Sequence, residues 1–270
     1  MIKAILAAGA ALAALAPFSA GAQDFKAKLL KPDTIVVGTT GSAPPTSMID
    51  ASGKLAGYDI AVMEKIAADL GVKVEFVQLD WAGLLPGLAA GRFDVVASGV
   101  TRSAERIASK DFIMLSPYIV NGVAVTKLTS NAKIASWDDV CGKKMGVIRG
   151  SNEPKLIQQA VPAGCVTNVV EYPGWTELAL DLKNGRIDWI GMDYLGPSYA
   201  ASKDRNITVL PEVRMPKTQS IAVSAADPDL AKAMDALIAR YREDGTLNAL
   251  VEKWFGQKVD FAKMPPDPKS

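Results

Sequence analysis

The 270-residue sequence contains no histidine and only two cysteines. Without imidazole, the chain cannot use Ser-His-Asp or Cys-His catalysis, HExxH metalloprotease chemistry or histidine-based zinc sites. Neither sign of charge dominates, because 30 lysines and arginines are balanced by 29 aspartates and glutamates. We therefore expect no nucleic-acid partner, which a basic surface would attract, and no metal or cofactor.

Long apolar runs are absent except near the N-terminus. Lys3 is followed by an Ala- and Leu-rich apolar stretch over residues 4–18 and by Ala-Gly-Ala at 20–22. This order is typical of a secretory signal peptide with a small-residue cleavage site. A membrane anchor is the alternative, but the run is shorter than the roughly 20 residues that span a bilayer. We expect cleavage after Ala22 and export to the periplasm.

The two cysteines are Cys141 and Cys165. Export places them in an oxidising compartment, which favours a single disulfide bond between them. Two separate buried thiols are the alternative.

Hydrophobic periodicity in the first hundred mature residues predicts alternating strands and helices. We expect a strand at 34–38, a helix capped by Asp59 and ended by Gly71, a strand at 72–77, a helix at 81–90 and a strand at 93–97. The order β-α-β-α-β is typical of an α/β sheet with parallel strands.

Part of this pattern occurs twice. Trp81, Gly91, Arg92 and Asp94 recur 94 positions later as Trp175, Gly185, Arg186 and Asp188. Both stretches are predicted to form a helix, a glycine C-cap and a buried strand. The repeat predicts two similar α/β units, and small ligands often bind between such units.

Several short motifs follow one another along nearly the whole mature chain. They are Val37-Gly38-Thr39 with Pro44-Pro45, Gly57-Tyr58-Asp59, Gly91-Arg92-Phe93-Asp94, Thr101 with Glu105-Arg106, Ser116-Pro117-Tyr118, Gly150-Ser151 and Asp244-Gly245-Thr246 with Lys253-Trp254-Phe255-Gly256. In this order and spacing the chain resembles the extracellular solute-binding proteins of family three, the receptors of polar amino-acid ABC importers.

The resemblance implies an α/β fold of the type II periplasmic binding proteins. Two lobes, each a mostly parallel sheet flanked by helices, would be joined by two hinge crossings near residues 120–123 and 215–219. Residues 23–120 and 216–270 would form the first lobe, and residues 121–215 the second. The protein would be a monomer that binds a free amino acid and docks on the membrane permease of an ABC importer.

A free amino acid carries a carboxylate and an ammonium, and a site that buries both must offer a cation and an anion. The resemblance assigns the carboxylate to Arg106, whose planar guanidinium can bond both oxygens, and the ammonium to Asp193. A solvated arginine and an ordinary loop aspartate are the alternatives. The other ligand-binding candidates are Thr101, Gly99, Ser98, Ser151, Asn152, Thr40 and Trp81, although a tryptophan that begins an amphipathic helix usually belongs to the core.

The first-lobe loop departs from the family pattern. Similar proteins often carry an aspartate, an aromatic residue and a phenylalanine where this chain has Thr40, Ala43 and Thr46. The missing carboxylate argues against a basic ligand, so we expect a neutral or acidic amino acid. Arg149 could pair with an acidic ligand side chain or could be solvated.

Two other functions share this fold. Exported dehydratases that act on prephenate or arogenate are similar, and Glu153, in Ser151-Asn152-Glu153, would be their general acid. A sensory module that feeds a kinase or channel would usually continue into a membrane segment. We expect a binding protein rather than an enzyme.

Overall fold

The computed structural model describes residues 25–165, 167–256 and 258–268. The expected signal peptide and its cleavage site lie outside these residues. In the described ranges, no helix has the length and apolar character needed to cross a bilayer.

The first lobe contains the predicted alternation of strands and helices. Its elements are β1 (Thr34–Thr39), α1 (Tyr58–Leu70), β5 (Lys73–Gln78), α2 (Trp81–Ala89), β6 (Val95–Thr101), α3 (Ala104–Ile107) and β7 (Phe112–Met114). Strand β1 pairs in parallel with β5 on one side and with β6 on the other. A small antiparallel sheet of β2 (Ser42–Ala43), β3 (Ser47–Ile49) and β4 (Leu55–Ala56) interrupts the pattern after β1.

The second lobe repeats this order. After η2 (Trp137–Val140) come β9 (Lys144–Ile148), α4 (Glu153–Ala160), β10 (Asn168–Tyr172), α5 (Trp175–Lys183) and β11 (Trp189–Asp193), followed by α6 (Leu195–Lys203) and β12 (Ile207–Val209). Strand β9 pairs in parallel with β10 and β11, as β1 does with β5 and β6. The two similar units predicted from the sequence repeat are confirmed.

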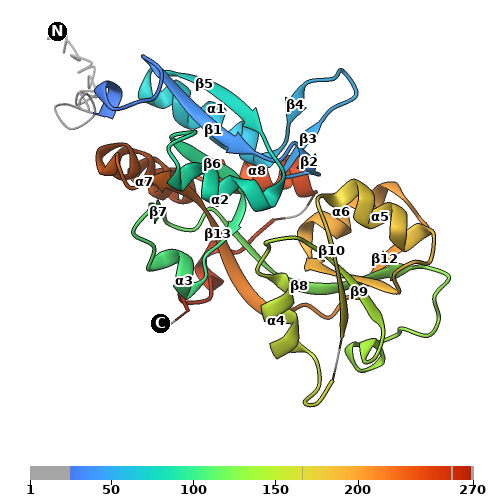
Figure 1. Cartoon of the computed structure of the whole chain (residues 1–270). Helices are drawn as coiled ribbons and strands as arrows, with labels where there is room; N and C mark the ends of the chain where they lie inside the picture. Colours follow the sequence, from blue (N-terminus) through green and yellow to red (C-terminus); the bar gives the residue numbers. More distant parts are fainter. Residues whose placement is uncertain (1–24, 166, 257, 269–270) are drawn as a thin grey trace, which may run out of the picture.

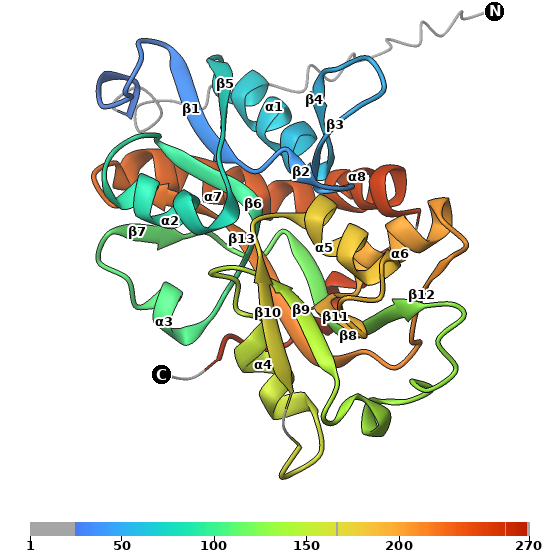
Figure 2. The same ribbon diagram turned by 45° about the vertical axis from the view of Figure 1, so that its right-hand side comes forward.

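Two long strands connect the lobes. Strand β8 (Ile119–Leu128) pairs with β11, strand β13 (Arg214–Ser224) pairs with β6, and the two strands pair with each other, all antiparallel. The main sheet therefore runs continuously in the order β10-β9-β11-β8-β13-β6-β1-β5 (Figure 1; β11 is labelled in Figure 2). Both predicted hinge crossings fall within these two strands.

The C-terminal helices α7 (Pro228–Glu243) and α8 (Thr246–Phe255) pack on the first lobe (Figure 2). Short turns η1 (Phe25–Ala27) and η3 (Phe261–Lys263) join the same core, where Phe25 and Phe261 are buried. Arg102, just after β6, donates from Nε to Asp267 Oδ1 at 2.8 Å. Both ends of the described chain thus belong to the first lobe.

The repeated aspartates explain the sequence repeat. Asp94 accepts a hydrogen bond from the Val36 N–H of β1, and Asp188 accepts one from the Lys144 N–H of β9, both at 2.8 Å. Each carboxylate therefore fastens the strand that follows its helix to the start of the neighbouring strand. The preceding Gly91 and Gly185 have φ of 69° and 67°, the left-handed conformation that ends a helix at low steric cost.

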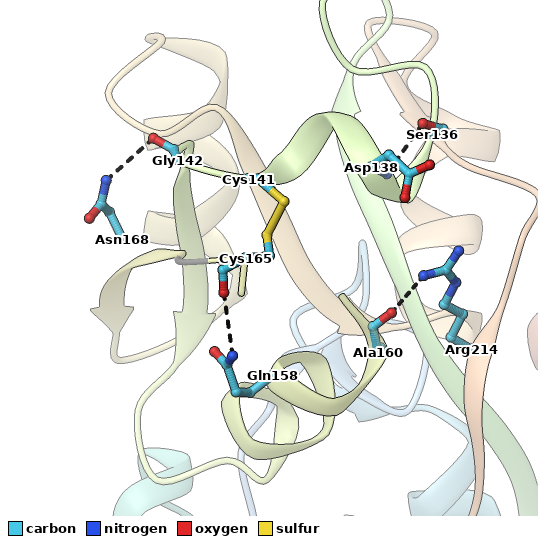
Figure 3. Close-up of a disulfide and its surroundings, with 9 residues drawn as sticks. All are labelled: Ser136, Asp138, Cys141, Gly142, Gln158, Ala160, Cys165, Asn168 and Arg214. Atoms are coloured by element: carbon cyan, nitrogen blue, oxygen red, sulfur yellow. Dashed lines mark hydrogen bonds between the residues drawn. A yellow bond between two sulfur atoms is a disulfide. The ribbon is translucent and has the colours of Figure 1, made fainter. Parts of the chain in front are cut away.

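The predicted disulfide is present between Cys141 and Cys165, whose Cα atoms are 5.1 Å apart. It joins the turn after η2 to the loop between α4 and β10 (Figure 3). Gln158 Nε2 donates to the Cys165 carbonyl at 3.4 Å, and Arg214 Nη1 donates to the Ala160 carbonyl at 2.6 Å. The C-terminal end of α4 is therefore held from both sides.

The predicted N-cap Asp59 is wrong. The N-cap of α1 is Gly57, two residues earlier, with φ of 139°. A Cβ at Gly57 would lie 2.3 Å from the Thr46 carbonyl oxygen. Asp59 is instead fully buried and accepts hydrogen bonds from Tyr118 Oη at 2.6 Å and from the Gly99 N–H at 2.8 Å. Burial raises the pKa of Asp59 to about 7, although both hydrogen bonds oppose the rise.

Candidate functional site

A cavity lies between the two lobes and encloses about 820 Å³, part of it open solvent. Its lining comes from both lobes and from both connecting strands. The lining residues are Thr40, Ser42, Ala43, Pro44, Thr46, Trp81, Ser98, Gly99, Thr101 and Arg106 of the first lobe, Ile148, Ser151, Asn152, Glu153, Pro173, Gly174, Trp175, Met192, Asp193, Gly196 and Pro197 of the second, and Asn121 and Gln219 of β8 and β13.

The structure brings all nine ligand-binding candidates to this one cavity. They come from the ends of strands and the starts of helices: Thr40 after β1, Trp81 at the start of α2, Ser98, Gly99 and Thr101 in β6, Arg106 in α3, Ser151 and Asn152 before α4, and Asp193 at the end of β11. Their contact with a ligand stays a prediction. Loops at the ends of parallel strands are where small ligands commonly bind in open α/β sheets.

Arg106 is held in place without a carboxylate partner. Ser103 caps the short helix α3 by accepting from the Arg106 N–H at 3.3 Å. The guanidinium donates to the Thr101 carbonyl at 3.2 Å and lies 5.6 Å from the centre of the Trp81 ring. Among the described residues no acidic side chain forms a salt bridge with it. Burial lowers the pKa of Arg106, against the fields of Glu153 and Asp193, but a guanidinium stays charged.

Asp193 lies at the end of β11, and its carboxylate contacts two side chains of β13. It accepts from Gln219 Nε2 at 2.6 Å and forms an ion pair with Lys217 Nζ, both from β13. Burial raises the pKa of Asp193 to about 7, and the neighbouring Glu153 adds to the rise while Lys217 opposes it. A carboxylate has about four lone-pair positions, so Asp193 retains acceptor capacity for a further cation.

Lys217 is the centre of a buried charge cluster. Its side chain is 5% exposed, and its ammonium pairs with both Glu153 and Asp193 and donates to Thr101 Oγ1 at 3.0 Å. These contacts join the start of α4, the end of β11 and the end of β6 to one hinge strand. Each of the three partners also lines the cavity.

Glu153 is the first residue of α4, and its carboxyl is ionised. Burial alone would raise its pKa, but the charge and hydrogen bond of Lys217 outweigh burial and lower the pKa to about 2. A general acid must carry a proton at the working pH. This environment therefore disfavours the role that a dehydratase would give to Glu153.

Two tryptophans line opposite lobes of the cavity. Trp81 begins α2 and Trp175 begins α5, the equivalent helix of the second lobe. The alternative that Trp81 is only a core residue does not describe its position, because it lines the cavity as well as packing against Leu84 and its neighbours. The N-terminus of α4, with its N-cap Asn152, also lines the cavity, and a helix N-terminus suits an anion.

Four residues of the site were not predicted from the sequence: Lys217, Gln219, Asn121 and Trp175. The sequence repeat could have indicated Trp175, because it corresponds to Trp81, which was predicted to bind the ligand. Lys217 and Gln219 lie in the predicted hinge segment 215–219. Side chains two residues apart in a strand share one face, so the segment could have indicated that both residues lie on the same side of the strand. Arg149, in contrast, lies outside the cavity lining, and its side chain, 59% exposed, is 3.6 Å from Glu171.

The lobes approach each other at second-lobe glycines. A Cβ at Gly150 would lie 3.3 Å from Ala82 Cα, one at Gly174 would lie 3.2 Å from Ser42 Oγ, and one at Gly196 would lie 3.4 Å from the Pro44 carbonyl oxygen. Close contacts between the lobes thus border the cavity.

Two α/β lobes with a polar cavity between them and two connecting strands define a two-lobe binding protein of the periplasmic type. The family model of the bacterial extracellular solute-binding proteins, family 3, matches residues 35–257. The chain belongs to this family, as its motifs predict.

Individual relatives agree with this assignment. The chain is 35% identical over 234 residues to the L-cystine-binding protein TcyJ of Escherichia coli (strain K12), covering 86% of each. Among solved structures, it is similar to an ancestral arginine-binding protein bound to glutamine (32% identity, TM-score 0.76, 84% of this chain and 100% of that one). It is also similar to the ancestral amino acid-binding protein AncCDT-1, a precursor of cyclohexadienyl dehydratase (28% identity, TM-score 0.76, 87% and 100%).

Proposed function

We propose that this protein is the amino-acid receptor of an ABC importer and that it grips a zwitterion between its lobes. The observation that carries the proposal is the pairing of charges across one cavity. Arg106 of the first lobe forms no salt bridge with an acidic side chain in the described part of the chain, and Asp193 of the second lobe retains acceptor capacity. In this proposal Arg106 takes the ligand carboxylate and Asp193 takes the ammonium.

The remaining candidates would complete the two subsites. Thr101, Ser151 and Asn152 would bond the carboxylate, and Gly99 would offer its carbonyl to the ammonium. Ser98 and Thr40, whose hydroxyl oxygens are 3.2 Å apart, would hold the first-lobe side of the cavity. Trp81 would pack on the ligand side chain.

Ligand binding would favour the closed arrangement, because only closure completes both ionic contacts. We place the lobe boundaries in the paired strands, with residues 23–120 and 216–270 in the first lobe and 121–215 in the second. The protein would act as a monomer in the periplasm, after cleavage behind Ala22, and deliver its ligand to the permease. The Cys141–Cys165 disulfide agrees with an oxidising compartment.

For the ligand we propose a neutral or acidic amino acid. Thr40 stands where a carboxylate would favour a basic side chain. L-Cystine is the first compound to test, since TcyJ is a cystine-binding protein. Although AncCDT-1 is described as the precursor of a dehydratase, the ion pair of Glu153 with Lys217 supports binding rather than catalysis.

A thermal-shift screen against L-cystine and the twenty standard amino acids tests the proposal. A ligand present at 100 times its Kd stabilises the folded protein by about 2.7 kcal/mol. We expect Arg106→Ala to abolish this shift, and we expect Arg92→Ala, at an exposed arginine of the same lobe, to preserve it. A shift that persists in the Arg106 variant would contradict the carboxylate assignment, and the absence of any shift in the unmodified protein would contradict the receptor.

A further inference from the structure

Lys217 is a buried cation that contacts three residues of the cavity lining. It lies in β13, where it is paired with Asn121 of β8 at the crossing between the lobes. It does not line the cavity itself, but all three of its side-chain partners, Thr101, Glu153 and Asp193, do. Any effect of Lys217 on a ligand therefore passes through these residues, and Lys217 is a positioning residue.

We propose that Lys217 sets the ligand specificity by cancelling one of the two carboxylates of the cavity, so that the site selects amino acids without net charge and rejects basic ones. This inference rests on the proposed receptor function and narrows it. The absence of a carboxylate at Thr40 is compatible with neutral and acidic amino acids, and the present inference excludes the acidic ones.

The charges of the site carry the argument. Of the lining residues described, only Arg106, Glu153 and Asp193 are charged. Together with Lys217 they amount to two cations and two anions when Asp193 is ionised, the form that a ligand ammonium favours. With the ligand carboxylate on Arg106 and its ammonium on Asp193, Lys217 retains Glu153, and every buried charge has a partner.

A charged ligand side chain would disturb this balance. A basic side chain would need a third carboxylate, and an acidic one would need a third cation, but the described lining offers neither. A buried charge without a partner is strongly unfavourable because its desolvation is not offset. Arg149 does not supply the cation, since it lies outside the cavity and close to Glu171.

Removing each member of the Lys217–Glu153 pair gives opposite expectations. Lys217→Met leaves an uncompensated carboxylate and should shift preference from neutral toward basic ligands. Glu153→Gln leaves an uncompensated ammonium and should shift preference toward acidic ligands. The double variant Lys217→Met/Glu153→Gln removes one charge of each sign and should return the preference to neutral ligands.

Isothermal titration calorimetry at pH 8 with L-leucine, L-glutamine, L-arginine and L-glutamate measures these preferences. We expect the ratio of arginine to neutral-ligand affinity to rise by about tenfold or more in Lys217→Met, and the glutamate ratio to rise similarly in Glu153→Gln. Lys127→Met is the matched control: Lys127 is also buried, but it bonds the Asn131 carbonyl at 2.7 Å, away from the cavity. Circular dichroism establishes that each variant is folded, and Glu153→Gln tests the idea even if Lys217→Met does not fold.

Different results would contradict the receptor function and the role of Lys217. If the unmodified protein binds none of the four compounds, the receptor function is wrong. If it binds a neutral compound and the folded variants keep the same charge preference, the role of Lys217 is wrong and the receptor stands. Preference of the unmodified protein for arginine or glutamate would also overturn the inference.

Discussion

At the scale of single residues, the site depends on buried polar groups that face other polar groups rather than a ligand. Asp59, which is fully buried, is one of them. Its carboxylate bonds the Gly99 N–H, and the Gly99 carbonyl in turn accepts from Gln219 Nε2 at 2.8 Å. Gly99 has φ of 63°, a conformation that favours glycine, so its peptide groups are fixed on both sides at the edge of the cavity.

The raised pKa of Asp59 predicts a stability that depends on pH. An unfolded aspartate releases its proton near 3.8, whereas folded Asp59 releases it near 7. Between these values the folded state holds the extra proton, so the free energy of unfolding falls as pH rises from about 4 to 7. The contribution lost is at most about 4 kcal/mol.

Asp59→Asn removes the titrating group and with it this part of the pH dependence. Urea unfolding of the two proteins between pH 4 and 8 measures their free energies of unfolding. As pH rises, the free energy of unfolding of the variant should increase relative to that of the unmodified protein. Asn can offset the curve by a constant amount, because it has one acceptor for two donors. Parallel pH curves for the two proteins would show that Asp59 does not titrate in this window.

The sequence predicted which residues meet at the cavity mainly where the family resemblance pointed to them, and their roles toward a ligand stay predictions. Arg106 and Asp193 were named from the family pattern, and both line the cavity. Lys217 was not, because its partners Glu153 and Asp193 are 64 and 24 residues away in the chain and meet it only after both lobes fold. Asp59 was misassigned because an aspartate before an apolar period looks the same whether it caps a helix or is buried in its first turn.

At the scale of elements, the disulfide of the second lobe lies beside the short helix α4. Helix α4 has eight residues, compared with 13 in the equivalent α1. The disulfide joins the turn before β9 to the loop after α4 and so closes a loop around both elements (Figure 3). That loop also carries Ser151, Asn152 and Glu153 to the cavity.

Replacing both cysteines, Cys141→Ser with Cys165→Ser, should lower the free energy of unfolding by about 3 kcal/mol, as expected for a closed loop of this size. Chemical denaturation measures the loss. The unmodified protein in dithiothreitol provides the comparison and should unfold at the same denaturant concentration as the double variant. Equal stability of the oxidised protein and the variant would contradict a stabilising role for the bond.

Elements with clear periodicity were predicted well. The strand at 34–38 and the helix at 81–90 match β1 and α2 to within one residue. The strand at 93–97 overlaps β6, which begins two residues later and ends four residues later than predicted. The small sheet of β2, β3 and β4 was not predicted, because its strands are two or three residues long and lie in a loop rich in glycine and proline. Such strands depend on their neighbours, not on a pattern of their own.

At the scale of the whole molecule, second-lobe glycines lie against the first lobe. Gly174 has φ of −155°, which any residue can adopt, so a side chain there acts through space rather than through backbone strain. Its nearest neighbour across the cavity is Ser42. Sequence could not identify this contact, since it depends on how the two lobes are oriented.

If ligand binding favours the closed arrangement, as proposed, Gly174→Val should weaken ligand binding more than it destabilises the ligand-free protein, because the added side chain meets Ser42 only when the lobes are closed. An overpacking cost of about 1–3 kcal/mol corresponds to a tenfold or greater loss of affinity. Calorimetry measures the affinity, and thermal unfolding without ligand measures the stability. Gly83→Val, where a Cβ would be 3.8 Å from its nearest neighbour, serves as control; unchanged affinity in the Gly174 variant would show that the lobes need not meet there.

The two connecting strands have a consequence for the gene. Because β8 leaves the first lobe and β13 returns beside it, both described ends of the chain are part of one lobe. The other lobe is a single uninterrupted insert whose two junctions are neighbours in space. It could therefore be exchanged for the corresponding segment of a relative by one replacement, with the host's ends, and anything fused to them, left untouched.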